Sequence, residues 1–143
     1  MSKPQSLNIL RETVEKRAGY RCEYCQTTMD ASTQRLELEH IIPISKDGLT
    51  ILDNLALSCR GCNGSKYNKT EGLDPVTEEV FPLFNPRKDS WNEHFEWDVN
   101  PLYLIGLTPI GRATIETLKL NRPQLIRVRT LLEKLNMHPP DIL

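Results

Sequence analysis

The sequence has no long hydrophobic run, no internal repeat and no low-complexity tract. No apolar stretch approaches the roughly 20 residues that a helix needs to span a bilayer, which argues against a membrane partner. The opening Met1-Ser2-Lys3-Pro4 lacks the apolar centre of a signal peptide, so we expect a cytoplasmic location. With 38% hydrophobic and 26% charged residues, the 143-residue chain has the composition of one folded domain with a modest core.

An excess of charge of one sign is also missing. The formal net charge is −1, which provides no general attraction to nucleic acid. Basic residues are nonetheless unevenly placed. Between residues 111 and 134 six basic residues stand against two acids: Arg112, Lys119, Arg122, Arg127, Arg129 and Lys134 against Glu116 and Glu133. Such a stretch can follow a phosphate backbone, but the charges alone favour a solvated helix face.

No cysteine stands alone. The four cysteines form two Cys-x-x-Cys pairs, Cys22 with Cys25 and Cys59 with Cys62. In a chain without a secretion signal, this arrangement predicts one tetrahedral zinc site in place of disulfides. A redox-active pair is the alternative, but it needs only one Cys-x-x-Cys and a thioredoxin-like βαβ setting that this chain lacks. A zinc-sensing switch that releases the metal on oxidation is a weaker alternative.

The hydrophobic pattern predicts an α+β protein. Its first part contains a helix over residues 5–18, strands over 36–41 and 54–58, and a short polar helix over 63–69. These elements and the cysteine pairs make up the expected core, residues 1–70.

The second part, residues 71–143, is expected to pack on this core as an extension of the same domain. Prolines predict that residues 71–100 are irregular. Two helices follow, starting near Thr108-Pro109 and near Pro123, and we expect them to form an antiparallel pair.

An acid–histidine pair, Glu39-His40, lies between the cysteine pairs, and Asn63 directly follows the last cysteine. Cleavage of a phosphodiester needs a base to activate water and a cation to neutralise charge. His40 suits the base because an imidazole is mostly neutral at pH 7. Glu39 and Asn63 offer hard oxygen atoms, which suit Mg²⁺. Since adjacent strand residues point to opposite faces, a bend near Ile42-Pro43 is needed to bring both Glu39 and His40 to one cleft.

The chain resembles the HNH endonucleases of the ββα-metal (His-Me finger) superfamily over residues 18–70. The resemblance is carried by Cys22-x-x-Cys25, Glu39-His40-Ile41-Ile42-Pro43, Asn54-Leu55 and Cys59-x-x-Cys62-Asn63-x-x-Lys66. It implies a ββα-metal core stapled by a structural four-cysteine zinc and products with 5′-phosphate and 3′-hydroxyl ends. It also implies roles for the site: His40 as general base, Glu39 and Asn63 as ligands of Mg²⁺ or Mn²⁺, and Asn54 as a brace for the loop between the strands. Asn63 stands where many members have a histidine.

Other interpretations remain for some of these residues. Asn63 can instead cap the helix that follows the second cysteine pair. The candidate nucleic-acid contacts are Lys66, Lys69, Arg87 and Arg112, with a solvated helix as the alternative for the lysines and surface ion pairs for the arginines.

For the whole protein, the first hypothesis is a metal-dependent endonuclease acting on DNA. The alternative is a zinc-stabilised nucleic-acid-binding module without chemistry. The intact set of Glu39, His40 and Asn63 favours the enzyme, because binding alone needs neither a base nor a Mg²⁺ site. The sequence leaves open whether RNA is also a substrate and whether the protein is a monomer or a homodimer.

Overall fold

The computed structural model describes residues 3–142, with side chains from residue 8 onward. The chain begins with α1 (Lys3–Arg17) and continues through β1 (Glu37–His40), β2 (Leu55–Ser58) and α2 (Arg60–Lys66). Two short hairpins follow, β3 (Glu71–Leu73) with β4 (Val80–Pro82), and β5 (Phe95–Trp97) with β6 (Leu104–Gly106), the second preceded by α3 (Trp91–His94). The chain ends with α4 (Pro109–Leu118) and α5 (Pro123–Lys134). This arrangement confirms the expected α+β class.

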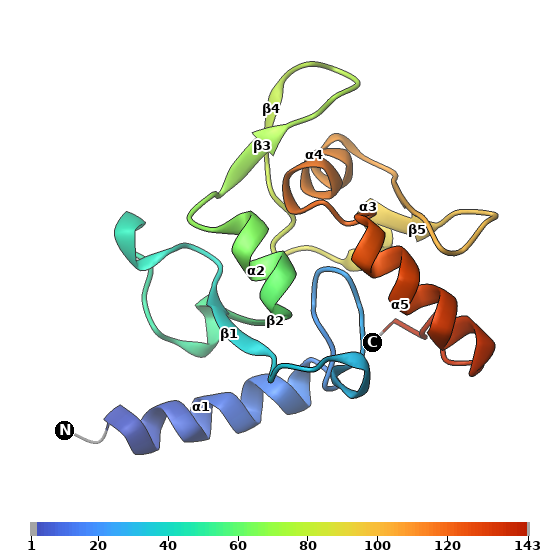
Figure 1. Ribbon diagram of the computed structural model, residues 1–143. Helices are drawn as coiled ribbons and strands as arrows, with labels where there is room; N and C mark the ends of the chain where they lie inside the picture. The colour runs from blue at the N-terminus through green and yellow to red at the C-terminus, as the bar shows by residue number, and fades with distance from the viewer. Residues whose placement is uncertain (1–2, 143) are drawn as a thin grey trace.

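The first part of the chain is built around an antiparallel pair of strands. β1 and β2 pair from Glu37 opposite Ser58 to His40 opposite Leu55. α1 lies along one side of this pair and α2 on the other (Figure 1). Val14 on α1 packs with Leu55 and Leu57 of β2 in a small core. All four residues of β2 are buried. The order strand, strand, helix therefore agrees with the prediction.

α2 begins earlier than predicted, because the second cysteine pair is part of the helix start. Cys59 is the N-cap, and its sulfur accepts a hydrogen bond from the Cys62 backbone N–H at 3.4 Å. Asn63 therefore lies inside the helix. The interpretation of Asn63 as the cap is wrong.

The larger core joins the two parts of the chain. Tyr24 and Ile41 from the first part pack with Phe84, Trp91 and Leu118 from the second. The Trp91 indole N–H also donates to the Tyr24 carbonyl at 3.1 Å. Both parts consequently share one hydrophobic interior.

Two expectations for the second part are wrong. Residues 71–100 are not irregular, since they contain β3, β4, α3 and β5. The strands have three residues each, and Pro82 ends β4, a position where the missing N–H is tolerated. The two last helices are present but do not form a close antiparallel pair: among the described residues α4 packs mainly on β6, on the β3–β4 hairpin and on α2. Figure 1 shows this hairpin projecting at the end of the molecule opposite α1.

Candidate metal and nuclease site

The four cysteines form one cluster. Their sulfurs all lie within 4.8 Å of one another, and the Cys25 and Cys59 sulfurs are 3.8 Å apart. A tetrahedral zinc with Zn–S bonds of about 2.3 Å separates its sulfurs by about 3.8 Å. The cluster therefore fits a closed, structural zinc site. Four sulfur ligands bind Zn²⁺ in preference to Mg²⁺ or Ca²⁺.

Burial affects the buried Cys22 thiol of this cluster most strongly when no metal is bound. It raises the pKa of the Cys22 thiol well above its ordinary value, and hydrogen bonds among the neighbouring cysteines add to the effect. A bound divalent cation replaces the thiol protons, so metal binding and proton release are coupled. The cluster has no position open to substrate chemistry if all four sulfurs ligate. Its role is to tie α2 to the first Cys-x-x-Cys pair.

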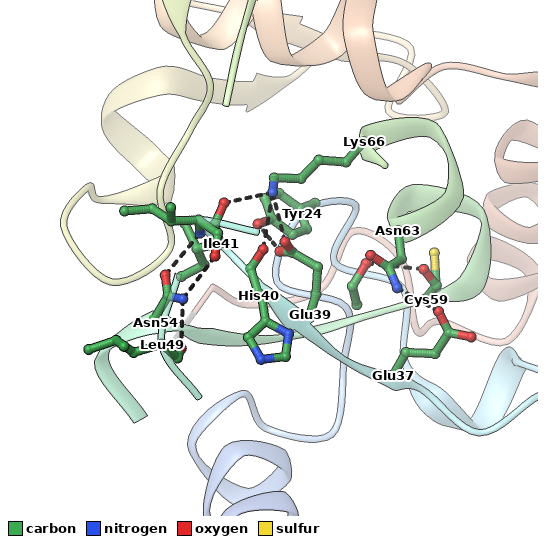
Figure 2. Close-up of polar contacts among 12 residues, drawn as sticks. Tyr24, Glu37, Glu39, His40, Ile41, Leu49, Asn54, Cys59, Asn63 and Lys66 are labelled. Atoms are coloured by element: carbon green, nitrogen blue, oxygen red, sulfur yellow. Dashed lines mark hydrogen bonds and ion pairs between the residues drawn. The ribbon is translucent and has the colours of Figure 1, made fainter. Parts of the chain in front are cut away.

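Two acidic residues of β1 face α2. Glu37 and Glu39 lie on the same side of the strand because side chains alternate with a period of two. The Asn63 amide Nδ2 donates to Glu37 Oε1 at 2.7 Å, and the Lys66 ammonium donates to Glu39 Oε2 at 2.7 Å (Figure 2). α2 and β1 are thus joined by two polar contacts, Asn63 with Glu37 and Lys66 with Glu39.

The contact between Lys66 and Glu39 is a buried ion pair. The side chains of Glu39 and Lys66 are 2% and 1% exposed. The Tyr24 hydroxyl donates to the other carboxylate oxygen of Glu39, and Lys66 also donates to the Ile41 carbonyl at 2.9 Å. Burial, together with the charge of Glu39, raises the pKa of Tyr24 well above its usual range, so the phenol stays protonated and remains a donor.

His40 projects away from the Glu39 carboxylate (Figure 2). Its Nε2 is hydrogen-bonded to Thr50 Oγ1 at 2.9 Å, and Thr50 lies in the loop between β1 and β2. The other ring nitrogen, Nδ1, is the one that this contact leaves for a ligand.

Asn54 holds the loop between β1 and β2, which carries Thr50. Its Oδ1 accepts from the Ile42 backbone N–H at 2.9 Å, and its Nδ2 donates to the carbonyls of Ile42 at 3.0 Å and Leu49 at 2.8 Å. The Asn54 backbone carbonyl also accepts from the Ile41 N–H at 2.9 Å. This is the bracing geometry that the sequence led us to expect for Asn54.

A shallow surface hollow of about 190 Å³ brings the central residues together. It is lined by Leu38, Glu39, His40, Pro43, Ile44, Asn63 and Tyr67. Glu39 and His40 both line this hollow, although their side chains leave opposite sides of β1 and the Glu39 side chain is almost fully buried. Since the amide nitrogen of Asn63 is engaged by Glu37, its carbonyl oxygen is the atom left to ligate a cation.

The candidate nucleic-acid contacts differ from the prediction. Lys66 is buried against Glu39, so its ammonium does not face a substrate. Arg87 pairs with Glu23, and Arg112 makes two bonds to Asp74 at 2.9 and 3.0 Å, which is the ion-pair alternative for both. These bonds hold the pKa of Asp74 below its usual range. Lys69 is exposed, and its contact with nucleic acid stays a prediction.

The basic stretch from 111 to 134 does not form a continuous row facing solvent. Arg129 is 1% exposed and donates to the carbonyls of Leu102 and Leu120. Arg122 turns toward the cysteine cluster. Its burial lowers the pKa of the guanidinium, but the nearby cysteine sulfurs outweigh this effect and raise it.

The sequence did not reveal four residues that contact the site. Tyr24 contacts Glu39, Glu37 contacts Asn63, and Thr50 contacts His40. Arg122 contacts Cys59 and Cys62. The alternation along β1 was a usable signal for Glu37, because it places this residue on the same face as Glu39. The other three lie in the first Cys-x-x-Cys turn, in the loop between β1 and β2 and in the turn between α4 and α5. These segments have no periodic sequence pattern that could predict the contacts.

Comparisons with known proteins agree with this geometry. Residues 22–69 match the family model of the HNH endonucleases. The chain therefore carries an HNH endonuclease domain over this segment, which confirms the resemblance seen in the motifs. Among the described residues, no helix is both long enough and apolar enough to cross a membrane.

One curated relative extends the similarity beyond the domain. The chain is 29% identical to the Septu protein PtuB of Bacillus thuringiensis over 104 residues, which cover 71% of this chain and 37% of that protein. The chain thus spans little more than a third of the length of this relative. No solved structure gives a significant match.

Proposed function

We propose that this protein is a metal-dependent HNH endonuclease that hydrolyses DNA phosphodiester bonds. The observation that carries the proposal is the single hollow that His40, Glu39 and Asn63 share within the HNH segment. A base and two oxygen ligands at one surface site are what hydrolysis of a phosphodiester needs.

His40 acts as the general base in this proposal. The Thr50 hydroxyl holds Nε2 and fixes the orientation of the ring, so that Nδ1 takes the proton from the attacking water. Asn54 keeps the loop that carries Thr50 in place through its bonds to Ile42 and Leu49. An imidazole is mostly neutral near pH 7 and can accept this proton.

Glu39 and Asn63 hold the working cation, Mg²⁺ or Mn²⁺. Each oxygen of Glu39 accepts one protein hydrogen bond, from Tyr24 or from Lys66. A carboxylate has about four acceptor sites, so lone pairs remain for a cation. When bound, the cation neutralises charge on the phosphate and on the leaving oxygen. With only two protein ligands, the site keeps room for water and phosphate, as Mg²⁺ sites generally do.

The structural zinc has a separate role in this proposal. It fixes α2 against the first Cys-x-x-Cys pair and so places Asn63 beside β1, on which Glu39 and His40 lie. A binding module without chemistry is a poorer fit, because Lys66, Arg87 and Arg112 are engaged in internal ion pairs.

Nicking of supercoiled plasmid in Mg²⁺ or Mn²⁺ tests the proposal. We compare the wild type with His40→Ala and His40→Gln, and with Asn92→Ala, an exposed change on α3, as the control. Each protein is checked for zinc content and for its circular dichroism. We expect the wild type and the control to nick, and both histidine variants to lose activity while retaining one zinc.

Two results contradict parts of this reasoning. If His40→Ala keeps the wild-type rate, His40 is not the base. If the wild type cuts none of plasmid, single-stranded DNA, branched DNA or RNA, but binds nucleic acid as tightly as His40→Ala does, the protein is a binding module.

A further inference from the structure

Arg122 brings the C-terminal helices into contact with the cysteine cluster. The residue lies in the turn between α4 and α5, far along the chain from the cysteines. Its Nη1 lies 3.6 Å from the Cys62 sulfur, and its Nη2 lies 3.6 Å from the sulfurs of both Cys59 and Cys62. The guanidinium thus spans the two sulfurs at the start of α2.

The end of α4 fixes the guanidinium in this position. Nη1 also donates to the carbonyls of Leu118 at 3.1 Å and Lys119 at 3.2 Å. Lys119 is the residue that ends α4, with a left-handed backbone conformation. The end of α4 therefore holds Nη1 of Arg122, and both Nη1 and Nη2 contact cysteine sulfurs.

The second cysteine pair leaves room for this contact. Gly61 stands between Cys59 and Cys62, and a Cβ added there would lie 2.5 Å from Nη2 of Arg122 and 3.1 Å from its Cζ. A side chain at this position therefore has to displace the guanidinium from the place it occupies. The glycine and the arginine are thus complementary, although they lie on different segments.

Electrostatics gives the contact a function. Four thiolates around one Zn²⁺ carry a net charge of −2, and three of these four cysteines are buried. A positive group with N–H donors against the sulfurs stabilises the charged, metal-bound form, since groups around a metal site orient and tune its ligands.

We propose that Arg122 is the outer partner of the four-cysteine metal site and fastens the C-terminal helices to it. Arg122 lies outside residues 22–69, the segment that matches the HNH family. The extension therefore helps to retain the metal. This role goes beyond the proposed nuclease activity and does not depend on it.

Competition for zinc with a colour-forming chelator tests this role. The variants are Arg122→Ala, which removes charge and donors, Arg122→Lys, which keeps the charge, and Gly61→Ala, which displaces the guanidinium. Arg127→Ala is the matched control, because it removes an exposed arginine from α5. We expect Arg122→Ala to weaken zinc affinity by about 10- to 100-fold, the usual range for outer partners of a metal site. Arg122→Lys and Gly61→Ala should give smaller losses, and Arg127→Ala none.

Cobalt supplies a readout that a merely structural role would not move. Co²⁺ bound to four thiolates has sulfur-to-metal charge-transfer bands in the near ultraviolet. Loss of N–H donors raises the energy of the sulfur electrons, so these bands should move to lower energy in Arg122→Ala and stay in place in Arg127→Ala.

The proposal is overturned if Arg122→Ala and Arg127→Ala hold zinc equally, within about twofold, and have the same cobalt spectrum. If Arg122→Ala does not fold, the milder variants decide the matter. Wild-type zinc affinity and an unshifted cobalt spectrum in both Arg122→Lys and Gly61→Ala would then overturn it.

Discussion

Replacing Lys66 by methionine should destabilise the protein strongly, because it leaves the buried Glu39 carboxylate without its counter-charge. The ammonium and the carboxylate are 2.7 Å apart, and their side chains are 1% and 2% exposed. Removing one partner of such a buried pair costs about 3–5 kcal/mol. In a chain of this size each kcal/mol lowers Tm by about 2–4 °C, so Tm should fall by roughly 6–20 °C.

Urea unfolding of the zinc-loaded proteins, followed by circular dichroism, measures this effect. The single variants Lys66→Met and Glu39→Gln are compared with the double variant that combines them. The double variant buries no charge and keeps an acceptor for the Tyr24 hydroxyl, so it should be more stable than Lys66→Met. Lys69→Met is the control, since an exposed lysine near the end of α2 should change stability by only about 0.5 kcal/mol.

Two results would refute this reasoning. The first is a Lys66→Met protein within about 1 kcal/mol of the wild type, a value typical of a weak surface pair. The second is a double variant no more stable than Lys66→Met, because a charged pair in contact has to show coupling of about 0.5–3 kcal/mol in a double-mutant cycle.

Three further predictions concern the loop, the metal and an ion pair. Gly48→Ala should lower both Tm and nicking, because the new Cβ would lie 1.7 Å from the Ile42 carbonyl oxygen, whereas Gly64→Ala, on a helix position with open space, should stabilise by about 1 kcal/mol. Removal of zinc by a chelator at neutral pH should abolish the unfolding transition seen by circular dichroism, and Mg²⁺ should not restore it. Asp74 has a folded pKa below its ordinary value of 3.8 because of Arg112, so its stabilisation is present above about pH 3.8 and is lost as pH falls further. The stability difference between wild type and Asp74→Asn, from urea unfolding at several pH values, should therefore shrink below pH 3.8 and stay constant above it.

The sequence was a good guide to the centre of the fold. The alternation before His40 and the buried run before Cys59 predicted β1 and β2, because a strand with one buried face leaves a period of two in the sequence. The paired cysteines predicted their own cluster, since two complete Cys-x-x-Cys pairs have the spacing of a four-cysteine zinc site. The family pattern added the brace at Asn54.

The rest depends on contacts between distant segments. Strands of three residues, such as β3 and β4, are too short to show a period, and Pro82 gave the wrong signal because it stands at a strand end. The choice of partner by a basic side chain is a tertiary matter. Nothing near Lys66 in the sequence says that it folds inward to Glu39, and nothing near Arg122 says that it reaches sulfurs 60 residues away.

The charges around the hollow determine how strongly it can attract a phosphate group. Glu39 is neutralised by Lys66, and the two arginines expected to contact phosphate are neutralised by Glu23 and Asp74. The chain as a whole is also close to neutral. A phosphate entering the hollow therefore finds little fixed positive charge from the side chains that line it. In the proposed enzyme, the divalent cation must supply most of the local attraction for the phosphate, so binding of the scissile group and loading of the working metal are expected to be cooperative.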